Sequence, residues 1–182
     1  MMKNLKHNQK STVWEYVFYL AVIILMLVVV PKYVMEKVIV DGSSMENSLY
    51  DGEKVLIEKV SRYFKGPERF DVVVFTRNHG TYTKTYIKRA IGLPGEKVQI
   101  TDNRILINGE EIAEGYGKNP MDTAGIAETP VLLGEDEYFV LGDNRRVSID
   151  SRDNSVGAVK LSELDGVVIL RVAPFSEFGI VR

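Results

Sequence analysis

The hydrophobic positions of the chain follow two different patterns. Tyr16 to Val30 form an apolar run without a charged side chain, which is closed by Pro31-Lys32. From Val38 onward, apolar residues instead alternate with polar ones in short segments rich in β-branched residues, as in half-buried strands. We therefore predict an N-terminal helix followed by a mostly β domain, built on an antiparallel, barrel-like sheet.

Turn residues separate the predicted strands. Asn108-Gly109 predicts a two-residue hairpin turn, and Thr101-Asp102-Asn103 predicts a second tight connection. Residues 113–130 carry Gly, Asn, Pro and Thr with little periodicity and read as a long surface loop. Short helices are expected at 61–65 and 160–164. The predicted strands cover 38–40, 54–59, 71–75, 83–91, 97–100, 104–107, 137–141 and 167–172.

The apolar run predicts a membrane anchor. It is slightly shorter than the roughly 20 residues that span a bilayer, but Val13, Trp14 and flanking lysines can extend it. A cleaved secretory signal peptide is the alternative, yet Val30 to Met35 offers no small residues for a cleavage site. The basic segment with Lys3, Lys6, His7 and Lys10 is short, and such a segment usually stays in the cytoplasm.

These observations predict a single-pass protein of the cell membrane. We expect a cytoplasmic tail at 1–12, a transmembrane signal anchor at 13–31 and an extracytoplasmic β-rich domain at 32–182. At 182 residues, the chain is long enough for one domain with a real core plus the anchor.

The composition argues against several classes of function. A formal net charge of -2 gives no whole-protein attraction to phosphate, so nucleic acid is not an expected partner. The absence of cysteine excludes disulfides, thiolate catalysis and cysteine-based metal sites. The two histidines, His7 and His79, are poor candidates for a catalytic base.

Ser44 is the candidate nucleophile. It follows Gly42 and Ser43 in the segment Val40 to Leu49. Glycine allows backbone conformations that a β-carbon forbids, and can thereby bring a peptide N–H and the hydroxyl to one point, which suits acyl transfer. Taken alone, Gly-Ser-Ser is more often an ordinary turn.

Lys88 is the candidate base. Side chains alternate between faces in the extended segment around it, so Lys88 and Arg89 cannot both be solvated on one side of a sheet, and one should face inward or into a cleft. The pKa of a lysine must fall from about 10.4 to roughly 7–8 before it can act as a base at neutral pH, which requires burial. From the residues alone, a Lys-Arg pair on a solvated edge strand remains the alternative.

Several segments occur in an order that resembles the bacterial type I signal peptidases, in their Gram-positive form with one anchor. The resemblance runs from the anchor to about Gly166. Its most specific parts are the Lys-Arg-Ala-Ile-Gly-Leu-Pro-Gly segment and the Gly-Asp-Asn-Arg segment. The matching segments are Gly42 to Met45, Arg69 to Phe75, Tyr86 to Glu96, Gly142 to Arg145 and Ser148 to Arg152.

The resemblance implies roles for individual residues. Ser44 would be the nucleophile, Lys88 the general base, and Ser148 the group that orients the lysine amine. Asp150 and Arg152 would form a supporting ion pair. Backbone N–H groups near Gly42 and Ser43, above all that of Ser44, would bind the oxyanion.

The chain departs from the family pattern at three places. Asn47-Ser48-Leu49 stands where relatives usually carry Pro-Thr-Leu. Gly42 stands where some relatives have a serine that helps to bind the oxyanion. Arg146-Val147 stands where an acidic residue and an asparagine are common.

The function implied by the resemblance is removal of signal peptides from exported preproteins, by a membrane-bound serine endopeptidase that forms an acyl-enzyme. No metal or cofactor is expected. The expected partners are preproteins with small residues one and three positions before the cut, the lipid bilayer and the protein export machinery. The substrate would bind as an extended strand along residues 38–41 and 82–87.

Two other classes of function remain open. A catalytically silent, membrane-anchored module that binds exported polypeptides would keep the fold without needing Ser44 or Lys88. A self-cleaving Ser/Lys regulator could use Ala124-Gly125 as an internal target, but the chain has no DNA-reading pair of helices.

Overall fold

The computed structural model describes residues 5–78 and 80–181, and of residues 5–11, 30 and 31 only the backbone. The side chains of the basic N-terminal segment and His79 therefore lie outside the described residues. The chain divides into two compact units, Met1–Glu36 and Lys37–Arg182.

The first unit is built on the helix α1, Leu5–Val29, which a π-helical turn at Val30–Val34 continues. The helix begins before the predicted anchor and runs through much of the predicted tail. The stretch Thr12–Val34 has 23 residues and a mean hydropathy of 2.5, and none of its described side chains is buried. A helix that exposes apolar side chains all round has the length and composition to cross a bilayer.

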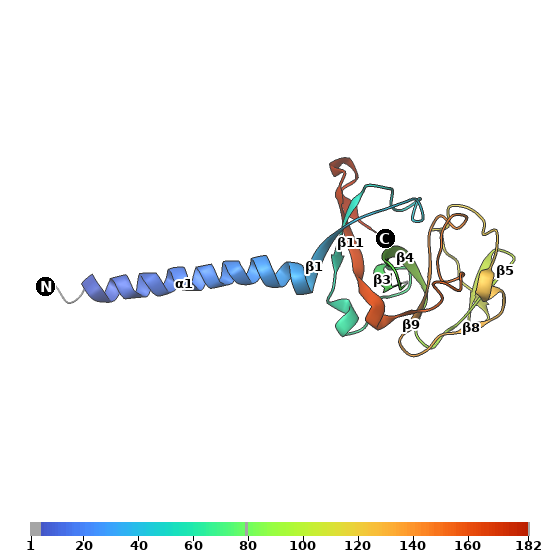
Figure 1. Ribbon diagram of the computed structural model, residues 1–182, viewed down its shortest axis with the longest axis horizontal. Helices are drawn as coiled ribbons and strands as arrows, with labels where there is room; N and C mark the ends of the chain where they lie inside the picture. The colour runs from blue at the N-terminus through green and yellow to red at the C-terminus, as the bar shows by residue number, and fades with distance from the viewer. Residues whose placement is uncertain (1–4, 79, 182) are drawn as a thin grey trace. The chain divides into compact units, whose positions relative to one another are not determined.

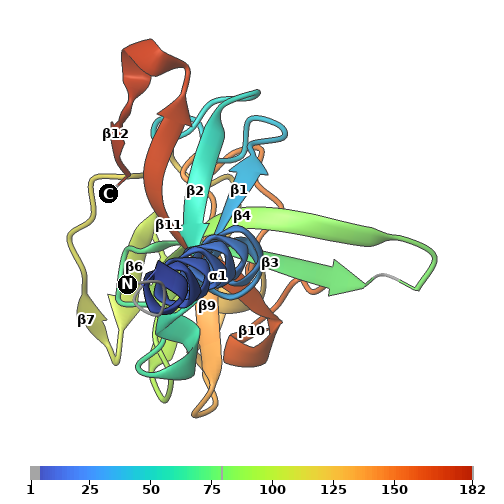
Figure 2. The same ribbon diagram turned by 90° about the vertical axis from the view of Figure 1, so that its left-hand side faces the viewer.

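The second unit is built mainly on a large antiparallel sheet (Figures 1 and 2). Its order is β1-β2-β11-β3-β4-β9-β10, and β12 pairs with β11. The strands are β1 Met35–Ile39, β2 Lys54–Glu58, β3 Val72–Asn78, β4 Thr83–Gly92, β9 Glu137–Leu141, β10 Val159–Lys160, β11 Leu164–Ala173 and β12 Gly179–Ile180. Figure 2 shows β3 and β4 running together as a long arm towards the turn that joins them.

A smaller antiparallel sheet has the order β7-β6-β5-β8. Its strands are β5 Lys97–Thr101, β6 Arg104–Ile107, β7 Glu110–Glu111 and β8 Val131–Leu132. Both predicted tight turns are confirmed. Asp102 and Asn103 join β5 to β6 with φ of 48° and 61°, and Asn108 and Gly109 join β6 to β7 with φ of 53° and 89°. This left-handed backbone is what a two-residue hairpin turn requires.

The prediction of a mostly β, antiparallel domain with one N-terminal apolar helix is confirmed. The predicted short helices are single 3-10 turns, η2 Ser61–Tyr63 and η4 Leu161–Glu163. Two further 3-10 turns are η3 Gly125–Glu128, inside the predicted long loop, and η5 Phe175–Glu177. The two-residue strands β8, β10 and β12 were not predicted, because two residues are too few to show an alternating pattern.

Strand β4 is covered on both faces over its second half, since every residue from Tyr86 to Gly92 is buried. On one face Tyr86 and Ala90 pack in a cluster with Val73 and Phe75. On the other face Ile87 packs in a different cluster. Both Lys88 and Arg89 are therefore buried, whereas the alternation alone required only that one of them face inward.

Among the described residues, two strand edges that have no neighbouring strand belong to β1 and β4. The ladder between β4 and β9 begins at Arg89, so the edge of residues 83–88 that faces away from β3 lies beyond that ladder. Strand β1 is the terminal strand of the sheet order. These two edges border the site described next.

Candidate active site

Ser44 lies in a compact turn between β1 and β2. Gly42 adopts a φ of +87°, which favours glycine, and its N–H donates a 2.8 Å hydrogen bond to Asp51 Oδ1. After Ser44 the chain buries Met45 and Leu49 in the core. The turn therefore holds Ser44 partly exposed while its neighbours fix the backbone in the core.

Strand β4 brings Lys88 to this serine. Lys88 Nζ lies 2.7 Å from Ser44 Oγ and 3.0 Å from the Ile87 carbonyl oxygen. The ammonium form donates to the hydroxyl, whereas the neutral amine can accept the hydroxyl proton at the same separation. Only 3% of the Lys88 surface is exposed. The two residues, 44 positions apart in the chain, thus form a contact pair.

Burial lowers the pKa of Lys88 from 10.5 to about 8, because the charged form loses its hydration. The negative charge of Asp150 acts in the opposite direction, and the positive charge of Lys84 lowers the pKa further. Smaller effects come from Asp143, which raises it, and Arg152, which lowers it. A neutral amine is therefore available at mildly alkaline pH.

The segment after β9 is hydrogen-bonded to the turn that carries Ser44. The Asn144 N–H donates to the Ser44 carbonyl at 3.0 Å, and its side-chain amide donates to the Ser43 carbonyl at 3.1 Å. An ideal Cβ at Gly142 would lie 2.6 Å from the Ser44 carbonyl oxygen and 2.2 Å from Ser148 Oγ. Only glycine permits this close approach. The Gly-Asp-Asn segment is therefore a structural turn that holds the site.

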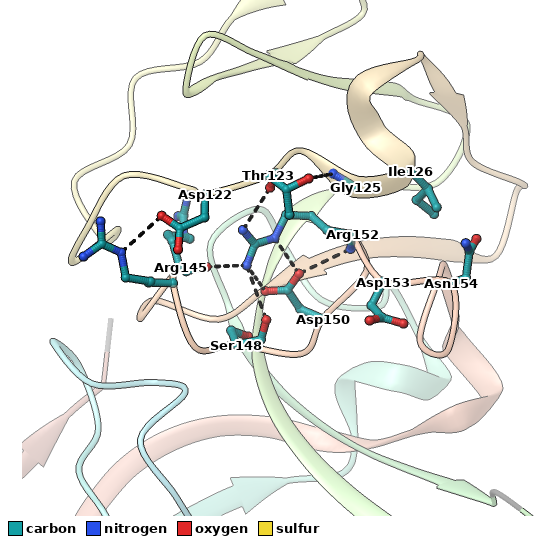
Figure 3. A pocket seen from close by; sticks show the side chains of 11 residues that line it. Asp122, Thr123, Gly125, Ile126, Arg145, Ser148, Asp150, Arg152, Asp153 and Asn154 are labelled. Atoms are coloured by element: carbon teal, nitrogen blue, oxygen red, sulfur yellow. Dashed lines mark hydrogen bonds and ion pairs between the residues drawn. The ribbon is translucent and has the colours of Figure 1, made fainter.

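Asp150 and Arg152 form the predicted ion pair, and both are buried (Figure 3). Arg152 donates from Nε to Asp150 Oδ1 at 2.8 Å and from Nη2 to Oδ2 at 2.9 Å. Asp150 also accepts the Gly142 N–H at 3.0 Å, and Arg152 donates to the Arg145 carbonyl at 2.7 Å. The pair therefore braces the loop on which Asn144 and Ser148 lie.

Ser148 lines the pocket of about 450 Å³ in Figure 3, together with Asp150 and Arg152. Its hydroxyl oxygen is buried and has no hydrogen-bond partner among the described residues. The contacts described for the Lys88 amine are those with Ser44 and Ile87. The expected orienting role of Ser148 therefore stays a prediction.

Two of the remaining predicted residues, Gly42 and Ser43, directly precede Ser44 in the chain. Gly42 and Ser43 are exposed, and the N–H of Gly42 is already used by Asp51. Asn47 has a φ of 107°, far from the value to which a proline ring is restricted, and its amide donates to the Tyr116 carbonyl at 3.1 Å. Arg146 is exposed and pairs with Asp122 at 3.2 Å.

Sequence reasoning missed that Arg89, the neighbour of Lys88 in the chain, is also buried beside the site. Arg89 donates from Nε and Nη2 to the two oxygens of Asp143, at 2.9 and 2.6 Å, and both side chains are fully buried. Arg89 also donates to the Ser48 hydroxyl at 2.9 Å and to the Phe70 carbonyl at 2.8 Å, and lies 3.7 Å from the centroid of the Tyr116 ring. The apolar residues on both sides, Ile87, Ala90 and Ile91, could have indicated that both basic residues are buried and need partners.

A groove of about 480 Å³ leads to Ser44 and Lys88. Its walls come from residues 38–45, which include the end of β1, and from residues 83–88 of β4, with Val147 and Ile149 completing the lining. The open strand edges described above thus border the groove. An extended peptide can pair with such an edge through its main chain.

Comparison with known proteins shows to which family the chain is similar. A family model described as signal peptidase, peptidase S26, matches residues 13–173. Signal peptidase I of Bacillus licheniformis is 32% identical over 177 residues, which are 93% of this chain and 94% of that protein. Signal peptidase IB of Staphylococcus aureus (strain COL) is 33% identical over 184 residues, covering 93% of this chain and 94% of that protein.

Among solved structures, a signal peptidase I from Enterococcus faecalis V583 aligns with a TM-score of 0.44 and 35% identity, covering 57% of this chain and 97% of that chain. The family model and the two relatives each span most of the present sequence. The chain therefore belongs to the signal peptidase family, peptidase S26, and the resemblance to type I signal peptidases is confirmed.

Proposed function

We propose that this protein removes signal peptides from exported preproteins, with Ser44 as nucleophile and Lys88 as general base. The observation that carries the proposal is the 2.7 Å contact between the Ser44 hydroxyl and a buried lysine whose pKa is lowered to about 8. A hydroxyl paired with a desolvated amine is the arrangement that an activated serine needs. The relatives named signal peptidase I support the choice of substrate.

The reaction proceeds through an acyl-enzyme. Neutral Lys88 takes the Ser44 proton as Oγ attacks the scissile carbonyl carbon, and the lysine then gives this proton to the leaving amine as the C–N bond breaks. Water is activated by the same amine, attacks the ester carbon and releases the signal peptide, while Ser44 Oγ regains a proton. The Ser44 N–H stabilises the oxyanion, and Ser43 is a second candidate donor.

Substrate binds along the groove as an extended strand. The open edge of residues 83–88 and the end of β1 supply main-chain partners. Val38, Val40 and Ile87 are apolar residues of the groove lining and select small side chains one and three positions before the cut. Ser148 completes the base by orienting the neutral Lys88 amine from its place beside Gly142.

The protein works at a membrane to which α1 anchors it. The 23-residue candidate span supports this part of the proposal, with residues 1–12 on the cytoplasmic side and residues 32–182 outside. Cutting beside the bilayer suits a substrate whose signal peptide is itself apolar. The export machinery is the expected source of that substrate.

The alternatives explain less. A silent binding module has no use for a lysine that is buried against a serine hydroxyl, because burying an amine is costly. As an internal target, Ala124-Gly125 is poorly placed. Gly125 lines the pocket of Figure 3 and packs against the Arg152 backbone, and neither residue lines the groove to Ser44.

The test is cleavage of a preprotein with an Ala-x-Ala site by the detergent-solubilised full chain. The wild type should cut after the final alanine, as read from the new N-terminus of the product. Ser44→Ala and Lys88→Met should each lose at least about a thousandfold in kcat/KM. Ser162→Ala and Lys97→Met change exposed residues outside the groove and serve as matched controls. Cleavage by Ser44→Ala at the wild-type rate would overturn the assignment.

A further inference from the structure

Two lysines lie against one buried aromatic ring in the groove. Lys84, Tyr86 and Lys88 occupy alternate positions of β4 and therefore share one face of the strand. Lys84 Nζ lies 5.2 Å from the centroid of the Tyr86 ring, and Lys88 Nζ lies 5.8 Å from it. The ring is fixed by stacking on Phe75, with centroids 5.1 Å apart. Both amines therefore lie near the same ring.

The other charged groups around Lys88 come from the segment after β9. Asp143 and Asp150 favour the protonated lysine, but each carboxylate is already paired with a guanidinium, Arg89 for Asp143 and Arg152 for Asp150. The positive charge of each guanidinium therefore partly cancels the effect of the carboxylate on the protonation of Lys88.

The groove side of Lys88 has a different set of groups. Ser44 and Tyr86 are the titratable neighbours there, and both are neutral at the pH of the reaction. Asp41 and Lys84 are the other charged side chains of the groove lining, and both are exposed. Of these two, Lys84 is the one that lies near the Tyr86 ring together with Lys88, and its charge lowers the pKa of Lys88. Its distinctive feature is that it lies where a substrate would cover it.

We propose that Lys84 is a positioning residue whose positive charge favours the neutral form of the Lys88 amine. A bound substrate strengthens this effect by excluding water from the groove. This inference rests on the proposed function of the groove. In the free protein, water and salt screen the exposed ammonium of Lys84. A peptide strand laid along residues 83–88 replaces that water with a medium of lower dielectric, in which two like charges repel more strongly. Substrate binding therefore helps to drive the proton off the catalytic amine.

The experiment compares pH profiles of the full chain. The profile of kcat/KM reports the free enzyme, and that of kcat reports the enzyme–substrate complex. In Lys84→Gln, the acid limb of kcat should move to higher pH by about half a unit, and that of kcat/KM by less. One unit below the midpoint, this shift makes kcat about threefold lower. Lys84→Arg keeps the charge and should restore the wild-type profile, and Lys97→Gln, an exposed lysine on the other sheet, should match the wild type.

Added salt sharpens the distinction. Salt should reduce the difference between Lys84→Gln and wild type in the acid limb of kcat/KM. The difference in the acid limb of kcat should remain, because the charges of Lys84 and Lys88 are screened less when substrate covers them. An unchanged acid limb of kcat in Lys84→Gln would overturn the inference. A rise in KM with no change in the pH profile would also overturn it, because it would make Lys84 a simple substrate contact.

A second measurement separates this inference from the proposed function. In a Ser44→Ala background, the pH dependence of amine modification at Lys88 can be followed by mass spectrometry, with and without an uncleaved signal peptide in the groove. The midpoint should fall on peptide binding, and this fall should shrink when Lys84→Gln is added. Equal shifts with and without Lys84 would refute the role of Lys84, whereas failure of the wild type to cleave any preprotein would refute the proposed function.

Discussion

Lys88 and Arg89 are neighbours in β4, and both are buried, but their surroundings differ. Arg89 lies between Asp143, Ser48, Phe70 and Tyr116, so that its charge and its N–H groups are met by a carboxylate, a hydroxyl, a carbonyl and an aromatic face. The described hydrogen bonds of the Lys88 amine go to one hydroxyl and one carbonyl, and neither group carries a charge.

The difference shows how one strand can hold a structural cation and an amine of lowered pKa side by side. A guanidinium stays charged in proteins, so its burial requires a partner such as Asp143. An amine can instead lose its proton when it is desolvated, and the pKa of Lys88 falls accordingly. The two residues therefore behave differently because their side chains differ in chemistry and because the two faces of the strand offer different partners.

The largest expected effect comes from removing the partner of Arg89. Asp143→Asn leaves the shape of the side chain but removes its charge, so Arg89 becomes a buried cation without a counter-ion. We expect the free energy of unfolding to fall by about 3–5 kcal/mol, measured by urea unfolding of the full chain in detergent. Asp102→Asn is the matched control, because its pair with Arg104 is exposed, and no measurable loss is expected. A loss for Asp143→Asn as small as that of the control would contradict the comparison.

A smaller effect of opposite sign is expected at Lys88. Its pKa is 10.5 when exposed and about 8 when folded, and the difference corresponds to a destabilisation of about 3 kcal/mol. Below pH 8, Lys88 is protonated in both states, and the folded protein bears this cost in full. Lys88→Met should therefore raise the free energy of unfolding by about 3 kcal/mol at pH 7, while abolishing cleavage.

The pH dependence tests the cause of this gain. Between pH 8 and 10.5 the folded wild type has lost the Lys88 proton while the unfolded chain still binds it, so wild-type stability rises with pH relative to the variant. The advantage of Lys88→Met should shrink through this window and be absent above it. Urea unfolding at several pH values measures this, and a gain that does not depend on pH would indicate better packing instead.

Much of the fold was predictable because its signals are local. Alternating segments marked the longer strands, and the Asn108-Gly109 and Asp102-Asn103 turns require the backbone conformations that these residue types favour. The two-residue strands β8, β10 and β12 carry no such signal because they are too short to show alternation. Strands β8 and β10 exist through pairing with strands further away in the chain, and β12 pairs with β11, which precedes it. The alternating pattern also did not reveal that β4 is covered on both faces.

The site was predictable in part for a similar reason. Ser44 and Lys88 follow from the chemistry that a serine nucleophile needs, together with the resemblance of their segments. Their 2.7 Å contact depends on how β4 and the turn after β1 fold against each other, which spacing does not encode. The two hydrogen bonds from Asn144 to the serine turn depend on the same packing. Arg89 was visible in the sequence, but its partner Asp143 lies 54 residues further on.

The smallest expected effect concerns Ser48, which lies in the turn that carries Ser44. Its hydroxyl accepts a 2.9 Å hydrogen bond from Arg89 Nη2, a nitrogen that also donates to Asp143 at 2.6 Å. Ser48→Ala removes one acceptor and leaves the ion pair in place. The free energy of unfolding should therefore fall by about 1.5 kcal/mol, the value of a hydrogen bond to a charged group, as measured by urea unfolding.

Ser48→Thr separates the hydroxyl from the identity of the residue. Threonine keeps the oxygen that Arg89 contacts, and its additional methyl group has room because Ser48 is only partly buried. Its stability and its rate of preprotein cleavage should match those of the wild type. If Ser48→Thr were as unstable as Ser48→Ala, the hydroxyl would not be what stabilises the turn, and the partners of Arg89 would reduce to Asp143, Phe70 and Tyr116. If it matches the wild type, serine and threonine are equivalent here because either one links the turn that carries Ser44 to the buried cation.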